Sequence, residues 1–242
     1  MSAPLVFRAR GVSVSFGGVR AVDGVDLDLA RGQVTGLIGP NGAGKTTLID
    51  AVTGFVRYEG SVELDGGRLD GLPPHARARR GLARTWQTVE LFDDLCVREN
   101  LAVAAARPGD ADEVLELLDL VRAADAMPSE LTQAERKRAG IGRAVAARPK
   151  LLCLDEPGAG LDAAQSAELA GLLPGLAADG TAILLVDHDM GLVLGSCDRV
   201  VVLDSGRVLA EGTPAQVRAD ETVVAAYLGR SHGGGAQAGG GA

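Results

Sequence analysis

The segment "GPNGAGKTT", from Gly39 to Thr47, is the part of the sequence that says most about the fold. It matches the pattern G-x-x-x-x-G-K-[ST], and it lies between the apolar run "VTGLIG" at 34–39 and the helical stretch "KTTLIDAVTG" at 45–54, as the pattern requires. The glycines let backbone N–H groups turn inward around phosphate oxygens, and the helix N-terminus adds partial positive charge. In this pattern Lys45 reaches the β- and γ-phosphates, and the hydroxyl of Thr46 binds Mg²⁺. The residues expected to hold the nucleotide are Gly39, Pro40, Asn41, Gly42, Ala43, Gly44, Lys45, Thr46 and Thr47.

Short apolar runs elsewhere in the chain predict the rest of a parallel sheet. They are "LLCLD" at 151–155, "AILLVD" at 182–187 and "RVVVLD" at 199–204. The alternating segments 6–16 and 25–30 predict an antiparallel β subdomain at the N-terminus. Helices are expected at 101–106 and 112–124, within a helical insert at about 101–145. The predicted fold is α/β, a P-loop NTPase core of parallel sheet flanked by helices, over residues 4–229. We expect the Gly/Ala-rich tail at 230–242 to be disordered.

Composition excludes several classes of function. The 242 residues carry a formal net charge of −8, so attraction to a nucleic-acid backbone is not expected. The basic run "HARARR" at 75–80 is interpreted as a solvated helix face. The three cysteines have no CxxC spacing, which argues against a disulfide scaffold or a zinc site. The beginning "MSAPLVFRAR" has no apolar core of a signal peptide, and no apolar run is long enough to span a bilayer, so a cytosolic protein is expected.

Two adjacent carboxylates end the strand "LLCLDEP". Asp155 can hold Mg²⁺ through water, and Glu156 can polarise an attacking water molecule. Alone, such a pair is more often a solvated strand end, but the phosphate loop upstream favours the catalytic interpretation. The adjacent glutamate and the lack of an N-K-x-D motif argue against a GTPase.

Two further polar residues follow strands. His188 lies just beyond the run "AILLV", and Gln87 lies in "RTWQTVELF". A lone histidine is most often structural and a lone glutamine is most often an exposed loop residue. The position of His188 after the neighbouring strand instead indicates proximity to a γ-phosphate.

Together these residues resemble the ATP-binding subunits of ABC transporters, over about Val6 to Gly229. By this resemblance Gln87 is the Q-loop glutamine and approaches Mg²⁺, "GAGLD" at 158–162 is the D-loop, and His188 is the switch histidine. The catalytic residues implied are Glu156, His188 and Gln87, and the Mg²⁺ ligands implied are Thr46, Gln87 and Asp155. Phe16 matches the ring that stacks on adenine, with a buried strand phenylalanine as the alternative. A soluble ABC protein of translation or DNA repair is disfavoured, because the chain has no tandem second domain and no zinc motif.

Finer motifs resemble the ATP-binding subunits of branched-chain amino acid importers, among them "RTWQTVELFDDLCVREN" and "VDHDMGLV". "LPPHARARRG" occurs also in the lipopolysaccharide-export ATPase, so lipopolysaccharide and urea remain alternative substrates. The segment 107–130 is shorter than in this subfamily, which puts docking to a standard permease in doubt. The resemblance implies permease subunits, an external solute-binding protein and a peripheral location at the cytoplasmic face of the membrane.

The segment "LTQAE" at 131–135 departs from the signature L-S-G-G-Q of this family, which contacts the ATP of the opposite subunit. Thr132 replaces serine and keeps a donor, Gln133 and Ala134 replace the glycines, and Glu135 replaces glutamine. The change at Ala134 is expected to matter most, because it adds a methyl group where the backbone of the family approaches the γ-phosphate of the opposite subunit's ATP. Thr132 and Glu135 also have capping-box spacing. The nucleotide side is complete while this clamp is weakened. A heterodimer with a second ATP-binding subunit is therefore expected, and a regulatory subunit with little turnover is the alternative.

Overall fold

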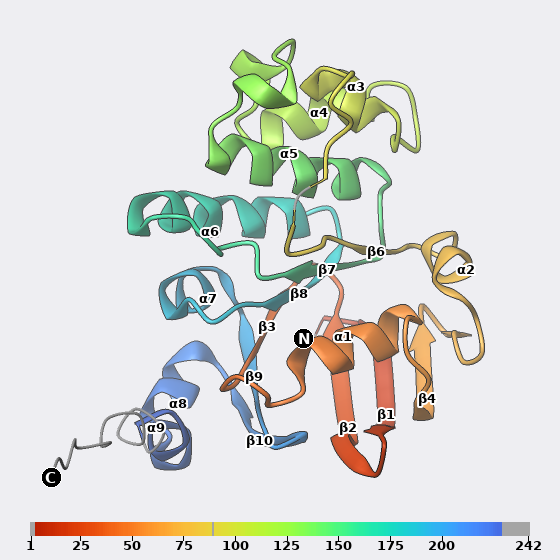
Figure 1. Ribbon diagram of the computed structural model, residues 1–242, viewed down its shortest axis with the longest axis vertical. Coiled ribbons are helices and arrows are strands. Elements are labelled where there is room, and N and C mark those ends of the chain that lie inside the picture. Colours follow the sequence, from red (N-terminus) through yellow and green to blue (C-terminus); the bar gives the residue numbers. More distant parts are fainter. Residues whose placement is uncertain (1–2, 89, 229–242) are drawn as a thin grey trace, which may run out of the picture.

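A six-stranded sheet forms the centre of the computed structural model, which describes residues 3–88 and 90–228 (Figure 1). Its order is β10-β9-β3-β8-β7-β6, and every neighbouring pair is parallel except β9 and β10. Its strands are β3 (Val34–Ile38), β6 (Leu82–Arg84), β7 (Leu151–Asp155), β8 (Ala182–Val186), β9 (Arg199–Asp204) and β10 (Arg207–Gly212). The predicted parallel-sheet α/β fold is confirmed. The tail at 230–242 and Gly229 lie outside the described residues.

Both faces of this sheet are covered, which explains why its strands are continuous apolar runs rather than alternating ones. Along β3, Leu37 belongs to one hydrophobic cluster and Ile38 to the other. Along β7, Cys153 and Leu154 are divided in the same way. The strands are therefore buried from both sides, and only their ends can present polar groups.

A second, antiparallel sheet in the order β2-β1-β4-β5 forms the predicted N-terminal subdomain. Its strands are β1 (Leu5–Phe16), β2 (Val19–Ala30), β4 (Glu59–Leu64) and β5 (Gly67–Arg68). Helix α1 (Lys45–Thr53) packs between the two sheets, because its buried residues share one cluster with both of them. The helix that follows the phosphate loop is thus held on two sides.

The remaining helices lie on the other face of the central sheet or at its edges (Figure 1). They are α2 (Pro74–Ala78), α3 (Val97–Ala102), α4 (Asp110–Leu117), α5 (Gln133–Ala146), α6 (Ala163–Ala177), α7 (Met190–Ser196), α8 (Pro214–Ala219) and α9 (Glu221–Leu228), with 3₁₀ turns at Val121–Ala123 and Pro128–Glu130. Helices α3 and α4 stand with α5 in the helical insert, above the core in the view of Figure 1.

Two predicted helices have different limits. The helix expected at 101–106 spans Val97–Ala102 instead. It begins earlier because Glu99 accepts a hydrogen bond from the Cys96 N–H and starts the first turn there. The helix expected at 112–124 ends at Leu117, because Asp119 adopts a positive φ of 51°. A short 3₁₀ turn carries the chain onward.

The interpretation of 75–80 as a solvated face is wrong for Arg77, which is buried. Its guanidinium donates to the carbonyl oxygens of Ala51 and Val52 at the C-terminal end of α1, at 3.1 and 2.8 Å. It also donates to the carbonyl oxygen of Leu72 at 2.9 Å. The guanidinium adds a charged donor to the last carbonyl groups of α1, and its positive charge suits the negative end of the helix dipole.

We expect Arg77→Leu to lower the free energy of unfolding by about 3 kcal/mol, because two buried carbonyl groups and one partly buried carbonyl group lose a charged donor. The exposed neighbour provides the control, since Arg79→Leu should change stability by less than about 0.5 kcal/mol. Urea denaturation followed by circular dichroism measures both. Equal effects of the two substitutions would show that Arg77 does not support α1.

Candidate functional site

The phosphate loop connects β3 to α1 and has a backbone that requires glycine at Gly44. This residue caps α1 with a φ of 100°, a conformation that L side chains rarely adopt. A Cβ atom there would lie 2.4 Å from the carbonyl oxygen of Ala21. The loop therefore packs directly on β2, with the N-terminus of α1 held in a fixed position.

Lys45 is the first residue of α1, and its side chain folds back over the loop. Its ammonium group donates to the carbonyl oxygens of Gly39 and Pro40, at 2.7 and 3.1 Å. Burial lowers the pKa of Lys45, and the negative charges of Glu156 and Asp155 oppose that shift. The two carboxylates thus lie within electrostatic range of the loop, as their predicted role requires.

The predicted catalytic side chains meet at the ends of β7 and β8. The amide of Gln87 donates to Oε2 of Glu156 at 2.8 Å, and Nδ1 of His188 lies 4.0 Å from the same oxygen. Glu156 has a positive φ of 48°, and its N–H donates to the carbonyl oxygen of Val186 at 2.7 Å. Such backbone strain in a non-glycine residue is concentrated at functional sites.

The predicted metal ligands have the chemistry that Mg²⁺ prefers. Thr46, Gln87 and Asp155 offer hydroxyl, amide and carboxylate oxygens, and Mg²⁺ is a hard cation bound by oxygen. Thr46 is exposed at the start of α1. Asp155 accepts from Arg84 through Oδ2 alone, which leaves Oδ1 for a metal-bound water. The donor set therefore fits the ion.

Phe16 lies at the end of β1 with 52 % of its surface exposed. The alternative of a buried strand phenylalanine is thus wrong. An exposed ring at a strand end is free to stack on a base, so its adenine contact stays a prediction.

The segment 131–135 is folded differently from the expectation. The capping box is confirmed, but the Thr132 hydroxyl donates to Oε2 of Glu135 at 2.7 Å, and the Thr132 N–H donates to the same oxygen at 2.9 Å. These bonds lower the pKa of Glu135. The donor that we expected Thr132 to keep is therefore engaged within the segment.

The two residues in place of the glycines face different ways. Ala134 is buried and shares a small cavity with Leu161 and Leu169. The expectation that its methyl group meets the ATP of the opposite subunit is therefore wrong. Gln133 is exposed, and its amide lies over Gly160, where an added Cβ would come within 2.3 Å of Nε2. Of the two replacements of glycine, Gln133 is thus the one that adds a side chain to the outer surface of the segment.

Sequence analysis did not identify two charged residues of the site. Asp187 is fully buried, and its carboxylate accepts from the N–H groups of Gly158, His188 and Asp189 at 2.8, 2.7 and 2.9 Å. Arg84 ends β6 and pairs with Asp155 at 2.8 Å. A charged residue at the end of an apolar strand was the available signal in both cases.

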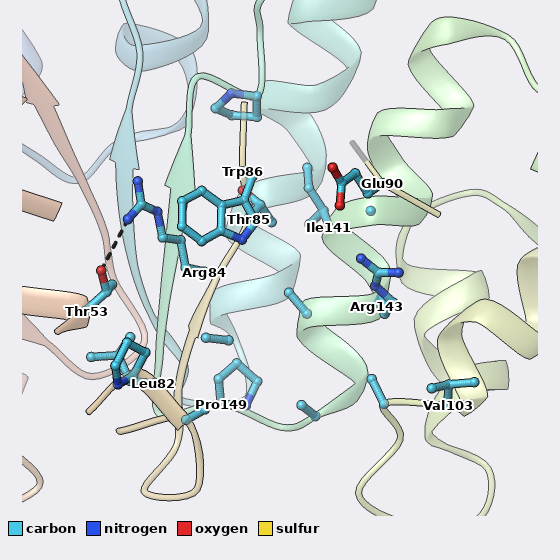
Figure 2. Close-up of a pocket in the computed structure, with 18 of the residues that line it drawn as sticks. Thr53, Leu82, Arg84, Thr85, Trp86, Glu90, Val103, Ile141, Arg143 and Pro149 are labelled. Carbon is cyan, nitrogen blue, oxygen red and sulfur yellow. Dashed lines mark hydrogen bonds between the residues drawn. The ribbon is translucent and has the colours of Figure 1, made fainter. Parts of the chain in front are cut away.

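A groove runs beside the site, between the Gln87 segment, the end of α1 and α5. Its volume is about 630 Å³. Four exposed hydrophobic side chains line this lateral groove, namely Phe55, Trp86, Phe92 and Val103. Figure 2 shows the ring of Trp86 beside the guanidinium of Arg84, with Arg143 and Glu90 on the opposite side.

Comparison with known proteins gives the family. A family model described as ABC transporter matches residues 22–159, and one described as branched-chain amino acid ATP-binding cassette transporter matches residues 207–233. The chain belongs to the ABC transporter family. Within it, this chain is an ATP-binding subunit similar to those of branched-chain amino acid transporters.

Individual relatives agree with this assignment. The chain is 37 % identical to the high-affinity branched-chain amino acid transport ATP-binding protein BraF of Pseudomonas aeruginosa, over 96 % of this chain and 100 % of BraF. It is 36 % identical to the lipopolysaccharide export system ATP-binding protein LptB of Escherichia coli, over 91 % of this chain and 96 % of LptB. A crystal structure of an ABC transporter cassette in its ADP conformation matches with a TM-score of 0.84 at 29 % identity, over 93 % of this chain and 99 % of that one. These matches confirm the P-loop NTPase fold.

Within residues 3–88 and 90–228, none of the helices has the length and apolar character needed to cross a bilayer.

Trp86 should report nucleotide binding by this ABC subunit. It is the only tryptophan, it adjoins Gln87, and the Arg84 guanidinium lies 4.2 Å from its ring centroid. We expect its fluorescence to change when ATP and Mg²⁺ are added, and to change far less in Lys45→Ala. Calorimetry first establishes that the protein binds ATP. If the fluorescence of Trp86 then does not change, the Gln87 segment does not respond to nucleotide.

Proposed function

We propose that this subunit hydrolyses ATP and thereby powers a membrane permease for branched-chain or related amino acids. The observation that carries the proposal is the convergence of Gln87, Glu156 and His188 beside the phosphate loop. A P-loop without a nearby base could bind nucleotide but would activate no water. Here a carboxylate, an amide and an imidazole converge at the strand ends.

Glu156 is the proposed general base. Its carboxylate would accept a proton from the water that attacks the γ-phosphorus in line, while the bond from that phosphorus to the bridging oxygen breaks and ADP leaves. Gln87 and His188 would orient the carboxylate and the water. The hydrogen bond from Gln87 already holds the carboxylate of Glu156 in place, so little reorganisation is needed. Positioning and electrostatics supply most of the catalysis in phosphoryl transfer.

Lys45 binds the β- and γ-phosphates, for which its ammonium leaves the loop carbonyls. Thr46, Gln87 and Asp155 hold Mg²⁺, which when bound neutralises charge on the phosphate oxygens. Phe16 stacks on the adenine ring.

The lateral groove is the proposed docking site for the permease. Its four exposed apolar side chains form a concave surface next to Gln87, so an occupant would lie within reach of the catalytic residues. This docking would hold the subunit at the cytoplasmic face of the membrane. An importer would also use a solute-binding protein on the external side. The short segment 107–130 bears on the choice of permease rather than on the existence of the groove.

The proposed solute follows from the similarity to BraF and from the match at 207–233. Lipopolysaccharide is the second candidate, supported by the similarity to LptB. Purification of the subunit with its permease, followed by uptake of labelled leucine into vesicles, would separate these candidates. Vesicles that show ATP-dependent uptake support the first, and their failure with a stable, ATP-hydrolysing complex counts against it.

Substitutions at Lys45 and Glu156 should have separable effects. Lys45→Ala should abolish tight ATP binding, whereas Glu156→Gln should preserve binding and slow hydrolysis by at least about 10²-fold, the usual contribution of a general base. Calorimetry measures the first effect and phosphate release the second. Near-normal turnover in Glu156→Gln would assign the base to another residue.

We also propose that the chain works as one half of a heterodimer. Its own nucleotide side is complete, but the segment 131–135 that it lends to the partner's ATP is altered. The engaged Thr132 hydroxyl and the exposed Gln133 side chain support this view. In such a pair the ATP on this chain is closed by an intact signature from the partner, and the other site turns over slowly. The alternative is a regulatory subunit with little turnover, and the same two observations also agree with it.

The isolated chain should accordingly have weak ATPase activity that rises when the partner and permease are added. Combined Gln133→Gly, Ala134→Gly and Glu135→Gln should raise the activity of the isolated chain. Because Ala134 is buried and Gln133 is exposed, Gln133→Gly alone should give more of this gain than Ala134→Gly alone.

Phosphate release at rising protein concentration measures these activities, since a site shared by two copies gives a cooperative dependence. A fast, cooperative wild-type ATPase that the triple substitution leaves unchanged would refute the heterodimer. Thr132 and the local backbone would then suffice as a clamp.

A further inference from the structure

The strongest feature outside the assigned machinery is the side chain of Arg84, the last residue of β6. Its side chain is 6 % exposed, yet it lies at the wall of the lateral groove. One amino group, Nη2, donates to Oδ2 of Asp155 at 2.8 Å. The other, Nη1, donates to Asp50 at 2.5 Å and to the Thr53 hydroxyl at 3.2 Å. One guanidinium therefore bridges the proposed metal ligand and the C-terminal part of α1.

The outer face of the same guanidinium is covered by aromatic rings. Its carbon lies 4.2 Å from the ring centroid of Trp86 and 5.7 Å from that of Phe55. The two rings pack edge to face at 4.9 Å, and each side chain is 51 % exposed in the groove. Figure 2 shows Arg84 between Thr53 and the ring of Trp86. A molecule in the groove would touch the rings, and the rings touch Arg84.

Arg84 is also incompletely satisfied. Its Nε is buried and has no hydrogen-bond partner among the described residues. A guanidinium carries five donors in a rigid plane, so the rings and the two carboxylates together determine where that plane lies. A shift of the rings would therefore be transmitted to Oδ2 of Asp155.

We propose that Arg84 is a positioning residue for Asp155, and that the Phe55–Trp86 pair on the groove wall sets its position and so the strength of metal binding. The inference rests on the proposed ATP·Mg²⁺ site. Arg84 occupies one carboxylate oxygen and leaves the other for a metal-bound water. Groups that orient a ligand in this way change metal affinity by about 10- to 100-fold when they are substituted.

The test measures the factor by which excess Mg²⁺ tightens ATP binding, from calorimetric titrations of the full chain with ATP in EDTA and with ATP in Mg²⁺. Arg84→Lys keeps the charge but loses the planar bridge. It should leave the affinity for ATP in EDTA within about twofold and reduce the Mg²⁺ factor by about tenfold. A lower thermal midpoint of the free protein with an unchanged Mg²⁺ factor would show a structural role and overturn the proposal.

Trp86→Leu keeps the test valid if Arg84→Lys does not fold, because Trp86 is half exposed. Loss of the cation–π contact should reduce the Mg²⁺ factor by about two- to fivefold. Phe92→Leu is the matched control, since Phe92 lines the same groove but faces Arg143, at 5.2 Å, rather than Arg84. It should leave the factor unchanged. Equal effects of the two substitutions, or none from Trp86→Leu, would contradict the aromatic part of the proposal.

The wild-type titrations separate this inference from the function beneath it. If the wild type binds no ATP, the proposed function is wrong and the inference falls with it. If it binds ATP with a Mg²⁺ factor of one, nucleotide binding stands but the metal role of Asp155 and its positioning by Arg84 are both wrong.

Discussion

The site depends on one constraint, the common direction of the parallel strands in the central sheet. Because β8 lies between β3 and β7 and is parallel to both, the carboxyl ends of these three strands lie side by side. The phosphate loop follows β3, the carboxylate pair follows β7 and His188 follows β8. Short loops are therefore enough to bring these groups together, and this is why ligands of α/β folds bind at the carboxyl ends of the strands. The buried faces of the sheet supply the rigidity that keeps these groups in place.

Much of this arrangement could be predicted from the sequence because it depends on local patterns. A G-x-x-x-x-G-K-[ST] stretch between a strand and a helix specifies its own conformation, and apolar runs of five or six residues identify buried parallel strands. The capping box at Thr132 was visible as a spacing, and it has formed. Helix ends in the insert were less predictable. A cap at Cys96 sets the beginning of α3, and a positive φ at Asp119 ends the helical stretch of α4.

The features that sequence analysis missed involve charged side chains paired across long separations in the chain. Arg77 bonds to carbonyl groups about 25 residues away, and Arg84 bonds to a carboxylate 71 residues away. A basic residue in a strand or short helix is usually solvated, so pattern alone favours the wrong environment for both. The orientation of Ala134 was missed for a related reason, since it depends on how α5 packs against the segment before α6.

The buried carboxylate of Asp187 has a mechanical consequence. It accepts one hydrogen bond from the N–H of Gly158, at the start of the "GAGLD" segment, and two from the N–H groups of His188 and Asp189. Separating these two segments would break the hydrogen bond from the Gly158 N–H and leave one oxygen of a buried carboxylate without its partner, at a cost of about 1–3 kcal/mol. The two segments are therefore expected to move together, so that a displacement of the "GAGLD" segment also displaces the imidazole of His188.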